Sequence, residues 1–170
     1  AARAAAALIG YAARLASGGP PAVAELTARL AALRETGARL LGVTPELGGA
    51  SSVSIVPNTT YGLALVAGGL DWKPGDVVVT TESEFPANLA PWLDLARHGV
   101  EVRRIPTRDG AYTAEAIVAA CDERTRLVSL SLVAYHTGFV APAAEVSAFC
   151  RERGIAFGLD GIQAAGAIPV

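Results

Sequence analysis

The chain has 170 residues, of which 52% are hydrophobic and 18% charged, and its formal net charge is -2. This length and hydrophobic content suit one sizeable core and exclude a disordered chain. Basic residues form no stripe interleaved with aromatic side chains, which argues against nucleic acid as a partner. The apolar runs are shorter than the roughly 20 residues that a membrane-spanning helix needs, so we expect no membrane segment.

The two cysteines, Cys121 and Cys150, show no CxxC spacing and have no histidine near them. The sequence therefore predicts neither a disulfide framework nor a metal site. Because nothing in the cysteine usage calls for an oxidising compartment, we expect a cytoplasmic protein.

The first part of the chain, residues 1–50, is predicted to be a helical segment. Residues 4–17 and 22–41 are rich in Ala, Leu and Arg, with apolar positions three and four apart. Gly18-Gly19-Pro20-Pro21 separates the two stretches and is typical of a helix break. We therefore expect two helices before the main domain.

From residue 51 onward, short β-branched runs alternate with helix-length segments. The expected strands are residues 53–56, 77–80, 100–105, 127–132 and 155–159. The expected helices are residues 59–70, 88–97, 113–120 and 143–153. This alternation predicts one α/β domain over residues 51–170, with a mostly parallel sheet and helices on both faces.

The first chemically interesting strand end is Asn58-Thr59-Thr60, which opens a predicted helix. In an open parallel sheet, ligands bind at the carboxyl ends of the strands. Free backbone N–H groups, the positive helix end and two hydroxyls favour a phosphate here. Simple capping of the helix by Asn58 is the alternative.

Two further strand ends carry an aromatic residue and an acid. Phe85 lies in a polar loop and can stack on a planar heterocycle, unless it folds back on the core. Asp160 ends an apolar strand, where a carboxylate is unfavourable to bury unless a cation pairs with it. The alternative for Asp160 is a turn residue, because Asp-Gly is common in turns.

Together the three strand ends supply an anion site, a flat aromatic cover and a carboxylate with an amide, Gln163, three residues further on. These groups correspond to the phosphate, the ring and the pyridinium nitrogen of pyridoxal 5'-phosphate (PLP).

The sequence then resembles a known family over about residues 22–170: the class V aminotransferase and cysteine desulfurase group of fold-type I PLP enzymes. The resemblance is carried by Asn58-Thr59-Thr60, Glu84-Phe85-Pro86-Ala87-Asn88, Thr137-Gly138 with Pro142 and Glu145, and Asp160-Gly161-Ile162-Gln163. It implies the large PLP-binding domain of that fold, preceded by helices.

The resemblance also implies a role for five residues. Thr59 and Thr60 meet the cofactor phosphate, Phe85 lies on the ring face, and Gln163 bonds the phenolic oxygen of the ring. Asp160 pairs with the protonated pyridine nitrogen and is the expected catalytic residue, because it keeps the ring an electron sink.

Three more residues are candidates for substrate or cofactor contact: Asn58, Tyr135 and His136. Members of the family often have Asn or Ser near the ring oxygen after the strand that precedes Thr137-Gly138. Here Ala134 or Tyr135 stands at that position, which leaves this contact open.

For function, the resemblance implies a PLP-dependent enzyme that acts on an amino acid by transamination, epimerisation or elimination, in a homodimer. A cysteine desulfurase or C-S lyase of the same family is an alternative. Desulfurases usually have His where Phe85 stands, and the aromatic variant is more similar to the kynureninase and isopenicillin N epimerase branches. A different class, a non-catalytic α/β domain that binds a phosphorylated ligand, also fits Asn58-Thr59-Thr60.

The family's Schiff-base lysine lies beyond the Asp-x-x-Gln motif. Lys73, the only lysine of the chain, falls in a turn at the opposite end of a strand from the other site residues. We therefore expect a fragment that is truncated before the Schiff-base lysine, lacks the small C-terminal domain and is inactive by itself.

Overall fold

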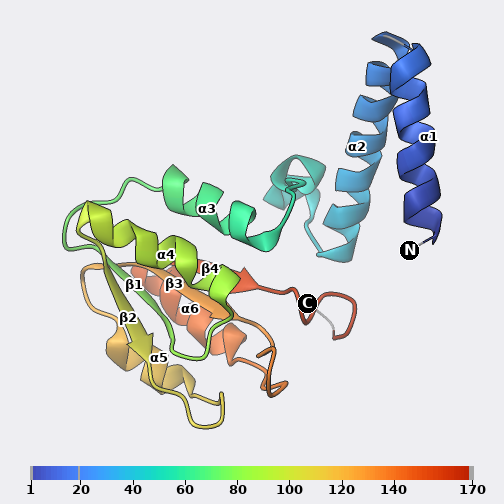
Figure 1. Ribbon diagram of the computed structural model, residues 1–170. Coiled ribbons are helices and arrows are strands. Elements are labelled where there is room, and N and C mark those ends of the chain that lie inside the picture. The colour runs from blue at the N-terminus through green and yellow to red at the C-terminus, as the bar shows by residue number, and fades with distance from the viewer. Residues whose placement is uncertain (1, 19, 169–170) are drawn as a thin grey trace. The chain divides into compact units, whose positions relative to one another are not determined.

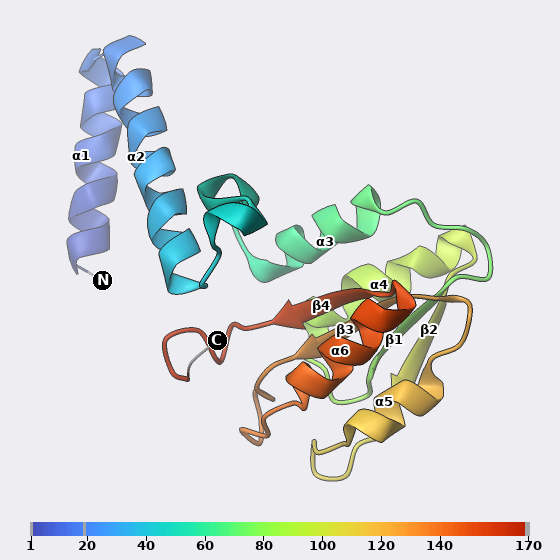
Figure 2. The same ribbon diagram turned by 180° about the vertical axis from the view of Figure 1, so that it is seen from behind.

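A computed structural model describes residues 2–18 and 20–168 (Figures 1 and 2). The chain divides into two units, Ala1–Ile55 and Val56–Val170. The described residues include no helix with the length and hydropathy of a membrane span.

The first unit is helical, as the periodicity of its sequence predicts. Its helices α1 (Ala2–Gly18) and α2 (Pro20–Leu40) are followed by the short 3-10 helices η1 (Pro45–Leu47) and η2 (Gly49–Ser52). Glu25 of α2 forms ion pairs with Arg29, at 2.6 Å, and with Arg14 of α1, at 3.8 Å. Such exposed pairs each contribute little to stability. The stability of the α1–α2 pair therefore depends mainly on helix propensity and packing.

The strand expected at residues 53–56 is absent, so that prediction is wrong. Val53 has extended dihedrals, φ -103° and ψ 120°, but within the described residues this segment pairs with no strand. A β-branched run forms a strand only where a neighbour takes its N–H and C=O groups. Here the run is the connection at which the two units divide.

The second unit is built on a four-stranded sheet in which every neighbouring pair is parallel. Its strands are β1 (Val77–Thr81), β2 (Glu101–Ile105), β3 (Thr125–Ser131) and β4 (Ala156–Asp160), in the order β2-β1-β3-β4. The parallel sheet confirms the prediction, and the observed bounds lie within two residues of the expected ones.

Helices cover both faces of this sheet, again as predicted (Figures 1 and 2). On one face lie α5 (Ala114–Ala120) and α6 (Ala143–Arg153), and on the other α3 (Thr59–Gly69) and α4 (Ala90–Asp94). In β1 the side chains of Val77 and Val79 pack toward α5 and α6, whereas Val78 packs toward α3 and α4. Period-two alternation thus puts apolar side chains into two cores, which is why the strand reads as a continuous apolar run.

The single helix expected at residues 88–97 is three short pieces instead. They are η3 (Pro86–Asn88), α4 and η4 (Leu95–His98). Pro86 and Pro91 each stand in a first turn, where a missing N–H is tolerated, and a proline further inside would break a longer helix. Asn88, the first residue of the expected helix, is fully buried and bonds other side chains.

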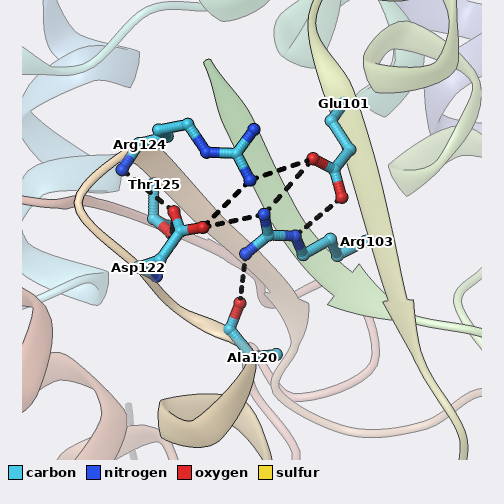
Figure 3. Close-up of polar contacts among 6 residues, drawn as sticks. All are labelled: Glu101, Arg103, Ala120, Asp122, Arg124 and Thr125. Carbon is cyan, nitrogen blue, oxygen red and sulfur yellow. Dashed lines mark hydrogen bonds and ion pairs between the residues drawn. The ribbon is translucent and has the colours of Figure 1, made fainter. Parts of the chain in front are cut away.

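At the amino edge of the sheet, Arg103 is the centre of an ionic network (Figure 3). Its guanidinium donates to Glu101 Oε1 and Asp122 Oδ2, both at 2.8 Å, and to the main-chain oxygen of Ala120 at 2.9 Å. Arg124 Nη2 adds a second pair to Asp122 at 3.1 Å. Hydrogen bonding to Arg103 is the main reason that the pKa of Asp122 falls to about 2. The hydrogen bonds of Arg103 to Glu101 first, and to Asp122 second, raise the pKa of Arg103.

This network predicts a specific acid sensitivity. Because the folded-state pKa of Asp122 lies below its usual value of about 3.9, its stabilising contribution is present above about pH 4 and is lost as pH falls toward 2. Asp122→Asn should therefore unfold with a shallower pH dependence in urea titrations between about pH 4 and 2. Glu123→Gln, at an exposed neighbour without an ion pair among the described residues, should behave as wild type, and equal slopes for both variants would contradict the assignment.

Candidate functional site

The carboxyl ends of the strands meet at one edge, and the chain leaves two neighbouring strands in opposite directions there. After β1 it crosses the α3 and α4 face, and after β3 it crosses the α5 and α6 face. Such a topological switch point opens a crevice between the two loops and is where open α/β sheets bind ligands.

A cavity of about 80 Å³ lies at this switch point. It is lined by Thr59, Phe85, Ala87, Ser131, Val133, Tyr135, Asp160, Ile162 and Gln163. Of the residues singled out in the sequence, the structure therefore brings Thr59, Phe85, Tyr135, Asp160 and Gln163 together. Thr60, Asn58 and His136 are not part of this lining.

A larger hollow of about 720 Å³ lies at the opposite, amino edge, beside Cys121 and Asp122. Most of its charged groups already have partners: Asp122 bonds Arg103 and Arg124, and Arg153 lies 5.4 Å from the Phe149 ring centre. We assign the functional site to the smaller cavity, because it combines the switch point with polar groups that are free to meet a ligand.

Asp160 ends β4 and is 9% exposed. Its Oδ1 accepts the N–H of Ile162 at 2.9 Å, so the turn expected as the alternative is present. Within the described residues nothing donates to Oδ2, and the side chain also lines the cavity. One carboxylate oxygen therefore closes the turn, and the other is available to a ligand.

Phe85 does not fold back on the core, so that alternative is wrong. Its side chain is 45% exposed and belongs to neither core cluster. The ring meets Tyr135 edge to face, with centroids 5.2 Å apart, and Tyr135 in turn lies 4.8 Å from the His136 ring. Three aromatic rings from the loops after β1 and β3 thus form a row beside the cavity.

At the start of α3, Asn58 Oδ1 accepts the N–H of Tyr61 at 2.8 Å. This is the capping bond expected as the alternative for Asn58. Thr59 is half-buried and lines the cavity, whereas Thr60 is exposed. Because the helix end carries a positive partial charge, Thr59 and the first-turn N–H groups can hold an anion.

The loops after β2 and β3 touch through Gly110. This residue has φ +77°, and a Cβ there would lie 2.9 Å from Thr137 Oγ1 and 3.0 Å from His136 Nε2. Only glycine combines this dihedral with so close an approach. Gly110 therefore determines how close the His136 loop lies to the loop after β2.

Sequence reasoning missed a buried polar network under the cavity. Glu84, 8% exposed, accepts from Ser131 N at 2.7 Å, Ser131 Oγ at 2.6 Å and Asn88 Nδ2 at 3.0 Å. Asn88 Oδ1 accepts from Ser129 Oγ at 2.8 Å and Trp92 Nε1 at 3.4 Å. The i, i+4 spacing of Glu84, Asn88 and Trp92 was the signal that could have indicated it.

Tyr112 lies close to this network. Burial, with a smaller contribution from the charge of Glu84, raises the pKa of Tyr112, so its phenol stays protonated near neutral pH. Within the described residues, no group of three His, Cys, Asp or Glu side chains could hold a metal ion.

The chain matches the family model described as aminotransferase class-V over residues 2–170. It belongs to the class-V aminotransferase family. A cysteine desulfurase of Klebsiella pneumoniae (strain 342) is 36% identical over 146 residues, which make up 83% of this chain and 35% of the relative. This class-V chain therefore spans about a third of the length of the curated relatives that it matches.

Solved structures show the same fold. A mutant of C-DES with glycine covalently linked to its PLP cofactor matches with a TM-score of 0.85 and 30% identity, over 98% of this chain and 45% of that one. The cystine C-S lyase C-DES in complex with its product, cysteine persulfide, matches with a TM-score of 0.83, 30% identity and the same coverage. The class-V chain thus has the fold-type I architecture that its sequence resemblance implies.

The close approach at Gly110 predicts a graded effect on stability. Gly138 also has positive φ, +73°, but a Cβ there would meet nothing within 4 Å. Gly138→Ala should lower the unfolding free energy by about 1 kcal/mol through backbone strain alone. Gly110→Ala should lower it further, by about 2–3 kcal/mol in total, and should shift the imidazole NMR signals of His136. Equal losses in urea denaturation would show that the contact with the His136 loop has no energetic effect.

Proposed function

We propose that the complete protein is a PLP-dependent enzyme that acts on an amino acid, and that the switch-point cavity is its cofactor site. Membership of the class-V family supports this, as does the likeness to C-DES, whose structure carries a PLP cofactor. The observation that carries the proposal is the buried Asp160, with one carboxylate oxygen free in the cavity.

The groups around the cavity fit the parts of PLP. Asp160 Oδ2 suits a cationic ring nitrogen, because a nearly buried carboxylate is stabilised by a positive partner. Phe85 and Tyr135 supply aromatic surface, and Thr59 stands at a helix end that favours a phosphate. One cavity, within one unit of the chain, is thus lined by an anion site at Thr59, an aromatic wall at Phe85 and Tyr135, and the acid Asp160.

Each residue then has a definite task. Bound PLP supplies an electron sink for negative charge at the substrate α-carbon. Asp160 holds a proton at the pyridine nitrogen, Thr59 and Thr60 bind the phosphate, Phe85 covers the ring face, and Gln163 donates to the ring oxygen. Asn58 fixes the start of α3, and through it the phosphate site.

The reaction that we favour is cleavage of a C–S bond in cysteine or cystine. The cysteine desulfurase of Klebsiella and the cystine C-S lyase C-DES support this choice over transamination or epimerisation. Phe85 has no titratable proton, so it cannot carry one to or from the substrate. The reaction is therefore more consistent with elimination of sulfur than with a sulfur transfer that needs a proton carrier at residue 85. Tyr135 and His136 are the polar aromatic side chains nearest to Phe85.

Lys73 is not a candidate for the covalent anchor of the cofactor. It lies in the turn before β1, where its N–H bonds Asp76 at 2.8 Å, and this turn is at the edge of the sheet opposite Asp160. We therefore place the lysine that would hold PLP outside these 170 residues.

We further propose a homodimer, as the family resemblance implies, and a location in the cytoplasm, as the cysteine usage led us to expect. Light scattering after size-exclusion chromatography of the complete protein would test the first point, since a monomer and a dimer differ twofold in mass. A non-catalytic domain that binds a phosphorylated ligand is the competing function, which the start of α3 alone would support.

The decisive experiment is a visible spectrum of the complete protein with PLP, before and after borohydride reduction. If the protein is the proposed enzyme, borohydride should replace the visible band with a near-ultraviolet band that stays on the protein, because reduction turns the C=N link of PLP into a stable C–N bond. Unreduced protein should release pyruvate and ammonia, together with sulfide from cysteine or with cysteine persulfide from cystine. PLP binding that phosphate competes away and that gives no visible absorption band would favour the non-catalytic domain. Turnover of other amino acids alone would favour transamination or epimerisation.

Two substitutions at Asp160 distinguish the roles of its two carboxylate oxygens. Asp160→Asn keeps an oxygen for the Ile162 N–H, so the fold should persist, but it loses the negative charge that holds the ring proton. We expect kcat to fall by about 100-fold or more with little change in Tm, whereas Asp160→Ala should lose activity and some stability as well. Unchanged turnover of the asparagine variant would overturn the role of Asp160.

A further inference from the structure

Glu84 is the least expected group in the site, because its carboxylate is nearly buried and yet pairs with no cation among the described residues. Its three partners are all neutral donors, from Ser131 and Asn88. A buried carboxylate without hydrogen bonds would be strongly unfavourable. The three bonds satisfy the Glu84 carboxylate. They also make the network rigid, but only as long as every member of the network stays in place.

The bond to Ser131 N replaces a missing piece of the sheet. The register of β1 with β3 reaches Val79 and Val128 and goes no further. Beyond that point β1 and β3 are no longer paired, so the N–H of Ser131, the last residue of β3, has a side chain rather than the main chain of β1 as its acceptor. Glu84 Oε1 accepts the N–H of Ser131 at 2.7 Å. A side chain thus replaces a main-chain acceptor at the point where the crevice opens.

The same bond reaches Asp160 through the sheet. Ser131 is the register partner of Asp160 in the β3–β4 pair, and Leu132 N donates to the Asp160 main-chain oxygen at 2.8 Å. The end of β3 therefore determines where the end of β4 lies. A shift of Ser131 would move the carboxylate of Asp160 with it.

On the other side, Glu84 and Asn88 hold the short segment that carries Phe85. Glu84 precedes Phe85 directly, and Asn88 follows three residues later, bonded to Ser129 and Trp92. Phe85 itself is exposed and has no core contact to keep it in place. Its position is therefore set by the two buried residues on either side of it.

We propose that Glu84 is a positioning residue that keeps Phe85 and Asp160 in register across the cofactor cavity. This deepens the proposed function and rests on it, since the two residues matter together only if a ring lies between them. The carboxylate acts through its neighbours and touches neither cofactor nor substrate.

The test uses a hydrogen-bond swap in the complete protein. In Glu84→Gln the introduced NH₂ faces the NH₂ of Asn88, so two donors oppose each other and the network breaks. In the double variant Glu84→Gln/Asn88→Asp that NH₂ can donate to the new carboxylate and to Ser131 Oγ, and one buried negative charge is kept. Glu82→Gln is the matched control, because exposed Glu82 also accepts a loop N–H, from Thr107 at 2.9 Å, but lies outside the network.

Three quantities are measured for each variant: the Kd for PLP, the visible circular dichroism per bound PLP, and the unfolding midpoint without PLP. We expect Glu84→Gln to weaken PLP binding by roughly tenfold or more and to reduce the dichroism, because a misplaced supporting shell has effects of this size. The double variant should return both values to within about threefold of wild type, and Glu82→Gln should match wild type.

Each contrary result has a distinct meaning. A lower unfolding midpoint for Glu84→Gln with unchanged Kd and dichroism would show a structural role only and overturn the inference. A folded double variant that binds PLP about tenfold or more weakly than wild type would overturn it too, and this comparison with wild type does not require the single variant to fold. Wild-type protein that gives no PLP band would instead overturn the proposed function, and the inference with it.

Discussion

The parallel register of β1, β3 and β4 is the constraint on which the rest of the unit depends. Because the strands are parallel, their carboxyl ends lie on the same side of the sheet, and the connections after β1 and β3 leave on opposite faces and open a crevice between them. At that crevice Glu84 supplies the acceptor that the sheet no longer provides. Charged groups at the other edge pair with each other around Arg103, whereas the carboxylate of Asp160 keeps an oxygen free. One side of the sheet is therefore cross-linked by ion pairs, and the other keeps an acceptor without a partner among the described residues.

Much of this could be predicted from the sequence, because local patterns follow from local physics. Apolar runs such as Val77–Thr81 and helix periods such as that of α6 depend on burial and on neighbours in the chain, and both were located within two residues. The cavity residues Phe85, Asp160 and Gln163 were singled out because parallel strands bring their carboxyl ends together. Thr59 was singled out at the end of an expected strand that does not form, and it lines the cavity from the start of α3 instead. Their roles toward a cofactor remain predictions.

What could not be predicted depends on contacts between distant segments. Residues 53–56 have strand-like composition, but whether a partner exists is a tertiary question. Asn88 looks like a helix cap in isolation, and only the approach of Ser129, 41 residues away, makes it an interior group. Glu84 likewise appears as a loop acid until β3 comes to lie beside it. A buried network of this kind is hard to predict from the sequence, because its polar members do not differ in type from polar residues on the surface.

The bond between Glu84 and Ser131 joins residues that are 47 positions apart in the chain. Contacts of such long sequence separation form late, since loop closure must precede them. The cavity therefore cannot exist as a preformed local motif, and it appears only after β3 has paired with β1 and β4 has joined β3. A ligand that binds there favours the fully assembled sheet over partly folded states, and so it stabilises β4, an edge strand of this sheet, by mass action.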